Sequence, residues 1–484
     1  MAKAVLVLEI SASDIRSNAV DLDSGKILCT VTKKTACKNS GIGKFEIDAD
    51  LLWKDLQETL GGVLEFCGKE HEFKAVTFSS AGDTLIPVDA DLKPLRNLIL
   101  PFDTRAQEEA QELTYLMGEK NFRSITGGSC LPSHTCAKIM WLKHREPRIF
   151  KSSRYFLSVS EYLFCKMGFG VYTDFTQACA KKLFHRIQRR WSLEIASCLD
   201  MDPSQAGETV QDSSFILGKV KNIGKIEFPY EIPVVLGLHD KEAALLGTGV
   251  SPNHSKIIGD FAGSSETVGC FSPDQVLSLA FSPSELGGSV RGDSSSVSST
   301  CNSQLYISWF RDKIYKGNGD VFADLEEKTH FDASSHVSFI TRGDAADCAV
   351  TGFDTSMDSH MIYQAILEGI TFQLKEALDS VEKTLGTPCR AVYCAGGIVS
   401  PKWLQLKADL FKREVRQITN HRVSAVGAAI LAAVSIGYYK TYEEAFTNMI
   451  QFTDVFVPNP AISAAYQERF INYCRECRKY YQYI

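Results

Sequence analysis

Pro233-Val-Val-Leu-Gly-Leu-His-Asp-Lys-Glu-Ala-Ala-Leu-Leu-Gly-Thr-Gly249 combines an apolar run, a turn and a helical pattern within seventeen residues. The apolar run predicts a strand, and the pattern after the turn predicts a helix that begins at Asp240. A carboxylate at such a place can accept a proton from a bound hydroxyl group. The alternative is that Asp240 only caps the helix, because Asp is a preferred N-cap residue.

Length and charge limit the class of protein. A chain of 484 residues is too long for one hydrophobic core and predicts two domains, 1–248 and 249–484. Its composition, 44% hydrophobic and 23% charged, is typical of globular proteins. A net charge of -6 and a pI near 6.0 argue against a general nucleic-acid surface, which needs clustered Lys and Arg.

Targeting and cysteine patterns predict a cytoplasmic protein. The N-terminus runs from Met-Ala-Lys directly into a strand pattern, without the features of a secretory signal. No stretch approaches 18 uncharged apolar residues, so we expect no membrane span. The 15 cysteines are odd in number and scattered, which indicates free thiols rather than a disulfide framework.

Two strand-turn-strand patterns lie about half a chain apart. The first covers strands at 4–10, 16–20 and 26–32. The second covers 256–271, with Gly263-Ser-Ser265 at its turn. This repetition predicts a duplicated architecture with a cleft between the halves.

The clearest helix is 361–385, where apolar residues recur on one face. The segment 278–303 is rich in Ser, Gly and Asp and predicts a loop. Further patterns predict helices at 49–67, 107–117, 138–143 and 424–437, and strands at 73–79 and 391–397.

Three segments occur in an order that resembles the FGGY family of carbohydrate kinases over nearly the whole chain: 233–249, 260–268 and 395–403. The resemblance implies an α/β protein with the two-domain actin-like/hexokinase (ribonuclease H-like) ATPase fold and a central cleft. It also implies ATP and Mg²⁺ as cofactors, a small sugar or polyol as substrate, and Asp240 as the catalytic base.

The first phosphate hairpin of the family corresponds here to the segment that begins at Glu9. The resemblance places Glu9 at the magnesium position, in contact through water, and Arg16 at the basic position. Ser11 and Ser13 are the candidate phosphate ligands. Ser11 and Ala12 replace the usual Gly and Thr, so a Cβ is added where backbone approaches phosphate and a hydroxyl donor is lost.

The remaining nucleotide contacts are assigned by the same resemblance. The second phosphate motif and the adenosine motif supply six candidates, namely Gly263, Ser264, Ser265, Gly396, Gly397 and Ser400. Glycines after a strand let a nucleotide lie close to the backbone. The alternative is an ordinary turn, which uses the same residue types.

Substrate contacts are assigned to Gly82, Asp83, Asp103 and Arg105. Gly82-Asp83 stands where xylulose kinases of the family carry Met-His, and is closer to polyol kinases such as erythritol kinase. Gly opens space and Asp supplies a hydroxyl acceptor, so we expect xylulose to be a poor substrate. Asp103 and Arg105 form either a ligand clamp or a surface ion pair.

A rival interpretation is a sugar-binding sensor or accessory protein that keeps the fold without turnover. Its support is the altered first hairpin, Arg422 in place of a usual Glu, and a poor match at Thr341–Asp344. Fold alone does not establish function. The pattern leaves the sugar, the phosphorylated hydroxyl and the oligomeric state open, and a homodimer remains one option.

Overall fold

The structure is a computed structural model that describes residues 2–11, 13–251, 256–263, 265–273, 284–288, 290, 294–315, 325, 327–341, 348–355, 357–396 and 400–482. Of the residues discussed above, Ala12, Ser264, Gly397 and 342–344 lie outside this range, as do 278–283, 289 and 291–293 of the predicted loop.

The first of two seven-stranded sheets is built around strand β1 (Ala2–Ile10). From Ala4 onward every residue of β1 is buried, as expected for a strand covered on both faces. β1 pairs antiparallel with β2 (Asp14–Asp21) and parallel with β6 (His71–Ser80). The other members of this sheet are β3 (Ile27–Lys34), β14 (Ile216–Ile223), β15 (Ile226–Val235) and β16 (Leu238–His239).

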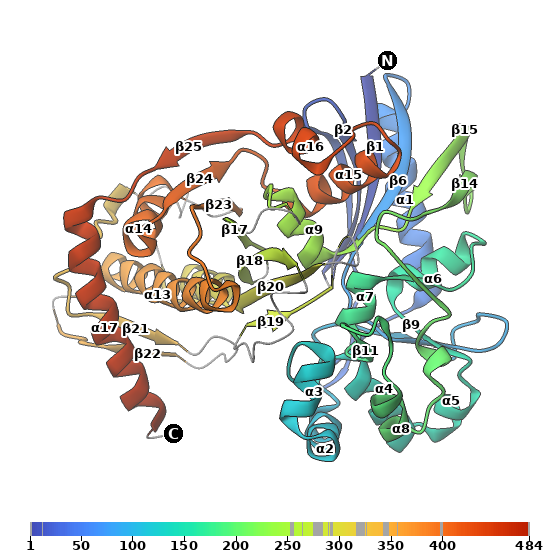
Figure 1. The fold of residues 1–484 in the computed structure, drawn as a ribbon, viewed down its shortest axis with the longest axis horizontal. Helices are drawn as coiled ribbons and strands as arrows, with labels where there is room; N and C mark the ends of the chain where they lie inside the picture. The colour runs from blue at the N-terminus through green and yellow to red at the C-terminus, as the bar shows by residue number, and fades with distance from the viewer. Residues whose placement is uncertain are drawn as a thin grey trace.

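The second sheet repeats this arrangement around strand β17 (Ile257–Ala262). β17 pairs antiparallel with β18 (Glu266–Pro273) and parallel with β23 (Ala391–Gly396). Its other members are β19 (Glu285–Leu286), β20 (Ser294–Cys301), β24 (Glu414–Ile418) and β25 (Phe452–Phe456). The predicted duplication is therefore confirmed: each sheet has a hairpin followed by a parallel neighbour. The two sheets form the two lobes seen in Figure 1.

The predicted helices are confirmed. The helix predicted at 361–385 is α13 (Ser359–Leu385), which starts where the Asp358 side chain accepts from the amides of His360 and Met361. The other helices are α1 (Ala49–Cys67), α2 (Gln107–Met117), α3 (Glu119–Thr126), α4 (Thr135–Arg145), α5 (Pro147–Ser152), α6 (Val159–Lys166), α7 (Phe175–Ala180), α8 (Leu193–Leu199), α9 (Asp240–Gly247), α11 (Ser303–Trp309), α14 (Pro401–Phe411), α15 (Val423–Ser435), α16 (Tyr442–Met449) and α17 (Pro460–Gln482).

Short strands complete the fold as small sheets. They are β4 (Lys38–Gly41), β5 (Lys44–Ile47), β7 (Ile86–Val88), β8 (Leu98–Ile99), β9 (Tyr155–Leu157), β10 (Tyr172–Asp174), β11 (Phe184–His185), β12 (Arg190–Trp191), β13 (Thr209–Gln211), β21 (Ser338–Thr341) and β22 (Cys348–Thr351).

Helices α9 and α15 cross between the two lobes (Figure 1). Their backbones come so close that a Cβ added at Gly427 would lie 1.8 Å from the carbonyl oxygen of Ala243. Buried residues of both helices join the core of the second lobe to Val5 and Val7 of β1. The junction between the lobes is thus a continuous apolar core.

The prediction of a loop at 278–303 is wrong for Ser294–Cys301, which form strand β20. Ser and Gly disfavour strands in isolation, but β20 pairs with β18 along its whole length and is mostly buried. Tertiary pairing therefore overrides the local preference.

All 15 cysteines are free, as predicted. Within the described part of the chain, no helix has the length and apolar character needed to cross a membrane.

Candidate active site

The candidate base lies where β16 ends against the first sheet. Gly237, at φ +91°, turns the chain after β15, and β16 then pairs in parallel with Ser79 and Ser80 at the end of β6. Asp240 is the first residue of α9, and its side chain is 46% exposed. The cap residue is His239, and no side-chain hydrogen bond caps this end. The structure thus does not support the alternative in which Asp240 is only a cap.

His239 lies between two carboxylates. Its Nε2 is 3.2 Å from Asp240 Oδ1, and its Nδ1 is 2.6 Å from Glu242 Oε2. Burial alone would lower the pKa of His239, but Glu242 and Asp240 outweigh burial and raise it to about 9. Burial pushes the pKa of Glu242 upward, yet His239 and Lys241 hold it below its ordinary value. His239 is therefore an imidazolium at neutral pH.

Gly82 makes room for this imidazole. A Cβ at Gly82 would lie 2.7 Å from His239 Cδ2 and 2.5 Å from the Cβ of Ala180. The absent side chain was expected to open space for substrate. Instead, the ring of His239 occupies the space beside Gly82.

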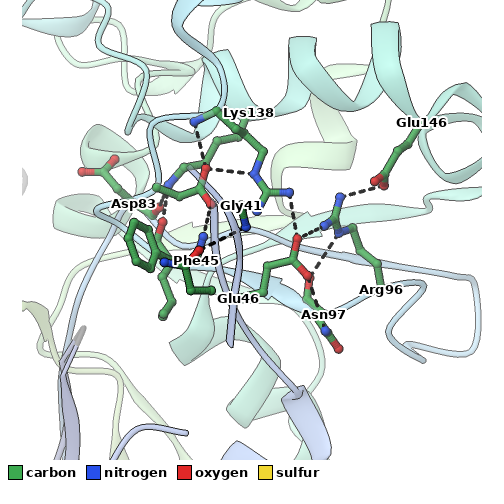
Figure 2. Close-up of polar contacts among 12 residues, drawn as sticks. Gly41, Phe45, Glu46, Asp83, Arg96, Asn97, Lys138 and Glu146 are labelled. Atoms are coloured by element: carbon green, nitrogen blue, oxygen red, sulfur yellow. Dashed lines mark hydrogen bonds and ion pairs between the residues drawn. The ribbon is translucent and has the colours of Figure 1, made fainter. Parts of the chain in front are cut away.

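Asp83, the next residue, keeps an unpaired oxygen. Its Oδ1 is buried and has no hydrogen-bond partner among the described residues. Its main-chain carbonyl accepts from Lys138 Nζ at 2.6 Å (Figure 2). Burial lowers the pKa of Lys138 to about 8, against the opposing effect of the Asp83 and Asp103 carboxylates. A hydroxyl donor on a ligand would satisfy Asp83.

Asp103 and Arg105 bind each other rather than facing an open site. Asp103 is fully buried, and its carboxylate accepts from Arg105 Nε at 2.9 Å, from Arg105 Nη2 at 2.7 Å and from the Phe45 amide at 2.6 Å. Arg105 also pairs with Glu46 at 2.8 Å, and Glu46 in turn pairs with Arg96 (Figure 2). This network, with both partners buried, holds strand β5 in place, and it differs both from the predicted ligand clamp and from the alternative of a surface ion pair.

The first hairpin neutralises its own cation. Arg16 Nη2 lies 2.6 Å from Asp14 Oδ2, and the Asp14 carboxylate also accepts from the hydroxyls of Ser11 and Ser13, each at 3.0 Å. The predicted phosphate ligands Ser11, Ser13 and Arg16 are thus brought together, but around an internal anion.

Glu9 links the two lobes. One oxygen accepts from Asn18 Nδ2 at 2.8 Å and the other from the hydroxyl of Ser424, on α15, at 2.5 Å. Glu9 is only 4% exposed. With both oxygens engaged and buried, Glu9 does not fit the predicted contact with magnesium-bound water in this arrangement.

The second hairpin and the adenosine segment lie side by side. Strand pairing places Ala262 opposite Gly396, and the turn after β17 closes with a bond of 2.7 Å from the Gly263 amide to the Ser265 carbonyl. Ser400 caps α14, where its hydroxyl accepts from the Trp403 amide at 3.1 Å. The described phosphate and adenosine candidates therefore converge at one edge of the second sheet.

A buried ion triad supports this edge. Lys407 Nζ, on α14, contacts Asp260 Oδ2 at 2.7 Å and Glu266 Oε1 at 2.5 Å, on either side of the phosphate turn. All three side chains are at most 2% exposed. Burial raises the pKa of Glu266 to about 7, although the charge of Lys407 acts to lower it. Burial acts to lower the pKa of Lys407, but the two carboxylates outweigh burial and raise it. The triad ties the phosphate turn to the helix after the adenosine segment.

Sequence reasoning missed His239, Glu242, Lys138 and Lys407. For Lys407 a signal existed, since it is a charged residue between Trp403 and Leu410 on the apolar stripe of the helix 401–411. For His239 and Glu242 the signal was their spacing around Asp240, one residue before and two after.

Comparison with known proteins gives the family. The model of the FGGY family of carbohydrate kinases matches residues 4–247 with its N-terminal domain and 316–436 with its C-terminal domain. Xylulose kinase of Lactococcus lactis is 24% identical over 96% of this chain and 94% of its own length. Glycerol kinase of Roseiflexus is 25% identical over 93% of each chain.

Solved structures have the same fold. Gluconate kinase from Lactobacillus acidophilus superposes with a TM-score of 0.88 at 19% identity, covering 99% of this chain and 98% of its own. Glycerol kinase from Plasmodium falciparum, solved with ADP, has a TM-score of 0.85 at 18% identity, covering 98% of both. The duplicated sheets have the actin-like/hexokinase architecture, and the chain belongs to the FGGY family of carbohydrate kinases.

Proposed function

We propose that Asp240 is the general base of an ATP-dependent kinase that phosphorylates a hydroxyl group of a small sugar or polyol. The observation that carries this proposal is the half-exposed carboxylate at the end of β16, held by His239 and not used as a helix cap. In the proposed reaction the acceptor hydroxyl gives its proton to Asp240 as its oxygen bonds to the γ-phosphorus. The bond from that phosphorus to the β-γ bridging oxygen breaks, and ADP leaves.

We infer a division of labour between 1–248 and 249–484. The first part supplies Asp240 and the unpaired oxygen of Asp83, both on the side of the first sheet. The second part would hold ATP against the turn at Gly263 and the end of β23. The placement of the two family domains, at 4–247 and 316–436, supports this division. Mg²⁺ would enter with ATP and neutralise phosphate charge, held chiefly by phosphate oxygens and water.

The acceptor is proposed to present a hydroxyl donor to Asp83. A buried carboxylate oxygen without a partner penalises any ligand that cannot donate to it. Xylulose and glycerol are the first acceptors to examine, because the relatives named above are kinases of those compounds. Asp103 and Arg105 are assigned a supporting role, since their polar atoms already pair with each other.

ADP release should be measured with ATP and Mg²⁺ across pentuloses, hexuloses, tetritols, pentitols, glycerol and gluconate. We expect at least one acceptor to raise ADP release well above the hydrolysis seen without acceptor, and EDTA to abolish that increase. Asp91→Asn is the matched control for Asp240→Asn, because Asp91 is 76% exposed and lies in a surface turn. Sugar binding detected by calorimetry, without ADP release from any acceptor, would instead favour a sensor.

A further inference from the structure

The structure contains a chain of two hydrogen bonds and one ion pair that ends on the proposed base. It runs from Ser296 on β20, through Glu242 and His239, to Asp240. The Ser296 hydroxyl donates to Glu242 Oε1 at 2.6 Å, and the other oxygen of Glu242 lies 2.6 Å from His239 Nδ1. Because Nδ1 is hydrogen-bonded to one carboxylate, Nε2 is left facing the other, 3.2 Å from Asp240 Oδ1.

We propose that His239 is a positioning residue that holds the Asp240 carboxylate in one orientation and keeps it ionised, and that Glu242 and Ser296 hold His239. This inference rests on the proposed role of Asp240 as the base. As an imidazolium, His239 has no lone pair to take a proton. The proton from the acceptor hydroxyl therefore stays on Asp240 until it leaves to solvent, and His239 neither gains nor loses one.

The surroundings of His239 are built to hold its ring. Its main-chain amide donates to the Thr176 hydroxyl of α7 at 2.7 Å. The ring itself lies against Gly82, where any side chain would collide with it. Helix α7 therefore holds the backbone of His239, and the segment after β6 limits the space open to its imidazole.

The same chain connects the base to the second lobe. Ser296 belongs to the second sheet, whereas His239 pairs with the first. A Cβ at Gly287, beside β19, would lie 2.5 Å from Glu242 Oε1, so the second lobe packs directly on this carboxylate. Asp240 would be correctly oriented only when the lobes are in contact.

The charges around His239 set the pH range in which its ring stays protonated. Glu242 and Asp240 stabilise the imidazolium, and Lys241 opposes them. Lys241 is in turn paired with Glu285 of β19 at 2.8 Å, and Glu285 also pairs with Lys182 at 3.0 Å. The pKa of His239 is raised above its unfolded value. The stabilisation that the protonated ring provides is therefore complete below about pH 6.5 and is lost as pH rises through about 9.

Kinetics of His239→Gln should separate positioning from simple folding. We expect kcat to fall about 10- to 100-fold, with KM for ATP and for the acceptor changing less than about threefold. The parent should lose kcat above about pH 9, and that alkaline loss should be absent from the variant. A loss centred near pH 8 would come from Lys138, whose pKa is about 8, and would be the same in the parent and the variant. Persistence in His239→Gln of the loss near pH 9 would overturn the proposal.

Glu242→Gln gives an independent measurement. It keeps a hydrogen-bond acceptor but removes the charge that raises the pKa of His239, so the alkaline loss should move to lower pH. An unchanged profile would contradict the proposal. Should either variant fail to fold, NMR titration of histidines in the intact parent remains. A His239 pKa near 9 that drops in Asp240→Asn supports the proposal, and a pKa near the unperturbed value of about 6.5 overturns it.

Asp240→Asn, assayed in parallel, separates the proposed role of Asp240 as the base from the proposed positioning role of His239. Normal turnover of Asp240→Asn would refute the proposed function itself. An inactive Asp240→Asn together with a fully active His239→Gln of unchanged pH profile would refute only the positioning role.

Discussion

At the scale of single residues, the first hairpin departs most from what phosphate binding requires. Arg16, its one cation near the turn, is already paired with Asp14 at 2.6 Å. A phosphate group must compete with this carboxylate, and like charges repel. The hairpin is therefore expected to limit affinity for ATP.

Asp14→Asn should relieve this competition. The amide keeps the shape of the side chain, and its oxygen can accept from one of the two serine hydroxyls while its NH2 group donates to the other, but it no longer neutralises Arg16. We expect KM for ATP to fall about three- to tenfold, with KM for the acceptor unchanged. The double variant Asp14→Asn/Arg16→Gln is the control and should lose the gain. A KM for ATP that stays level or rises in Asp14→Asn would show that Arg16 does not meet the nucleotide.

The sequence predicted which residues belong to the site better than it predicted which residues contact each other. Asp103 and Arg105 could be picked from their spacing, but only the fold shows that each satisfies the other and that strand β5 depends on them. Gly82 was recognised as special for the wrong reason, since its neighbour is His239. Contacts between residues that are distant in sequence could not be predicted from one amino-acid sequence.

At the scale of elements, the buried triad fixes α14 against the phosphate hairpin. Removing Lys407 leaves Asp260 and Glu266 buried without a cation. Breaking a buried ion pair from one side costs about 3–5 kcal/mol. The loss of stability is expected at the proposed phosphate turn between β17 and β18, where the triad lies.

Lys407→Met should therefore lower the free energy of unfolding by about 3–5 kcal/mol. Burial raises the pKa of Glu266, and the variant lacks the Lys407 charge that opposes this rise, so the folded state takes up a proton as pH falls. The loss should be largest near pH 8 and smaller near pH 5.5, as measured by urea unfolding. Lys54→Met, at a side chain that is 70% exposed, should change stability by less than about 0.5 kcal/mol. A pH-independent loss would contradict this explanation.

The crossing of α9 and α15 makes a second prediction. Gly427→Ala places a Cβ 1.8 Å from the carbonyl oxygen of Ala243, so the helices must separate. We expect a loss of about 1–3 kcal/mol in the free energy of unfolding, together with reduced kcat. Gly61→Ala in α1, whose Cβ would meet only a side-chain methyl at 3.2 Å, is the control and should stay within about 1 kcal/mol of the parent. Equal effects of the two changes would mean that close helix approach is not what Gly427 provides.

Periodicity explains which elements were predictable. Helix α13 carries a long apolar stripe, so its pattern is unambiguous. Strand β20 has mostly small polar residues, and it exists because β18 and β19 pair with it. Local sequence therefore predicts amphipathic elements and misses those that depend on pairing.

At the scale of the whole molecule, duplication was visible in the order of motifs. Two hairpins half a chain apart became two sheets of the same plan, each with a parallel strand beside its hairpin. The contact between the lobes was not visible, because it depends on Glu9 meeting Ser424 and on Glu242 meeting Ser296. These bonds join residues that no local pattern relates.

The central claim is that Asp240 removes the proton of the acceptor hydroxyl. Its most direct measurement is a single-turnover, rapid-quench comparison of parent and Asp240→Asn, with radiolabelled ATP and the preferred acceptor. We predict that the rate constant for phosphoryl transfer falls by about 10²–10⁴-fold while the affinity for both ligands is kept. Phosphoryl transfer at the parental rate in Asp240→Asn would contradict the account.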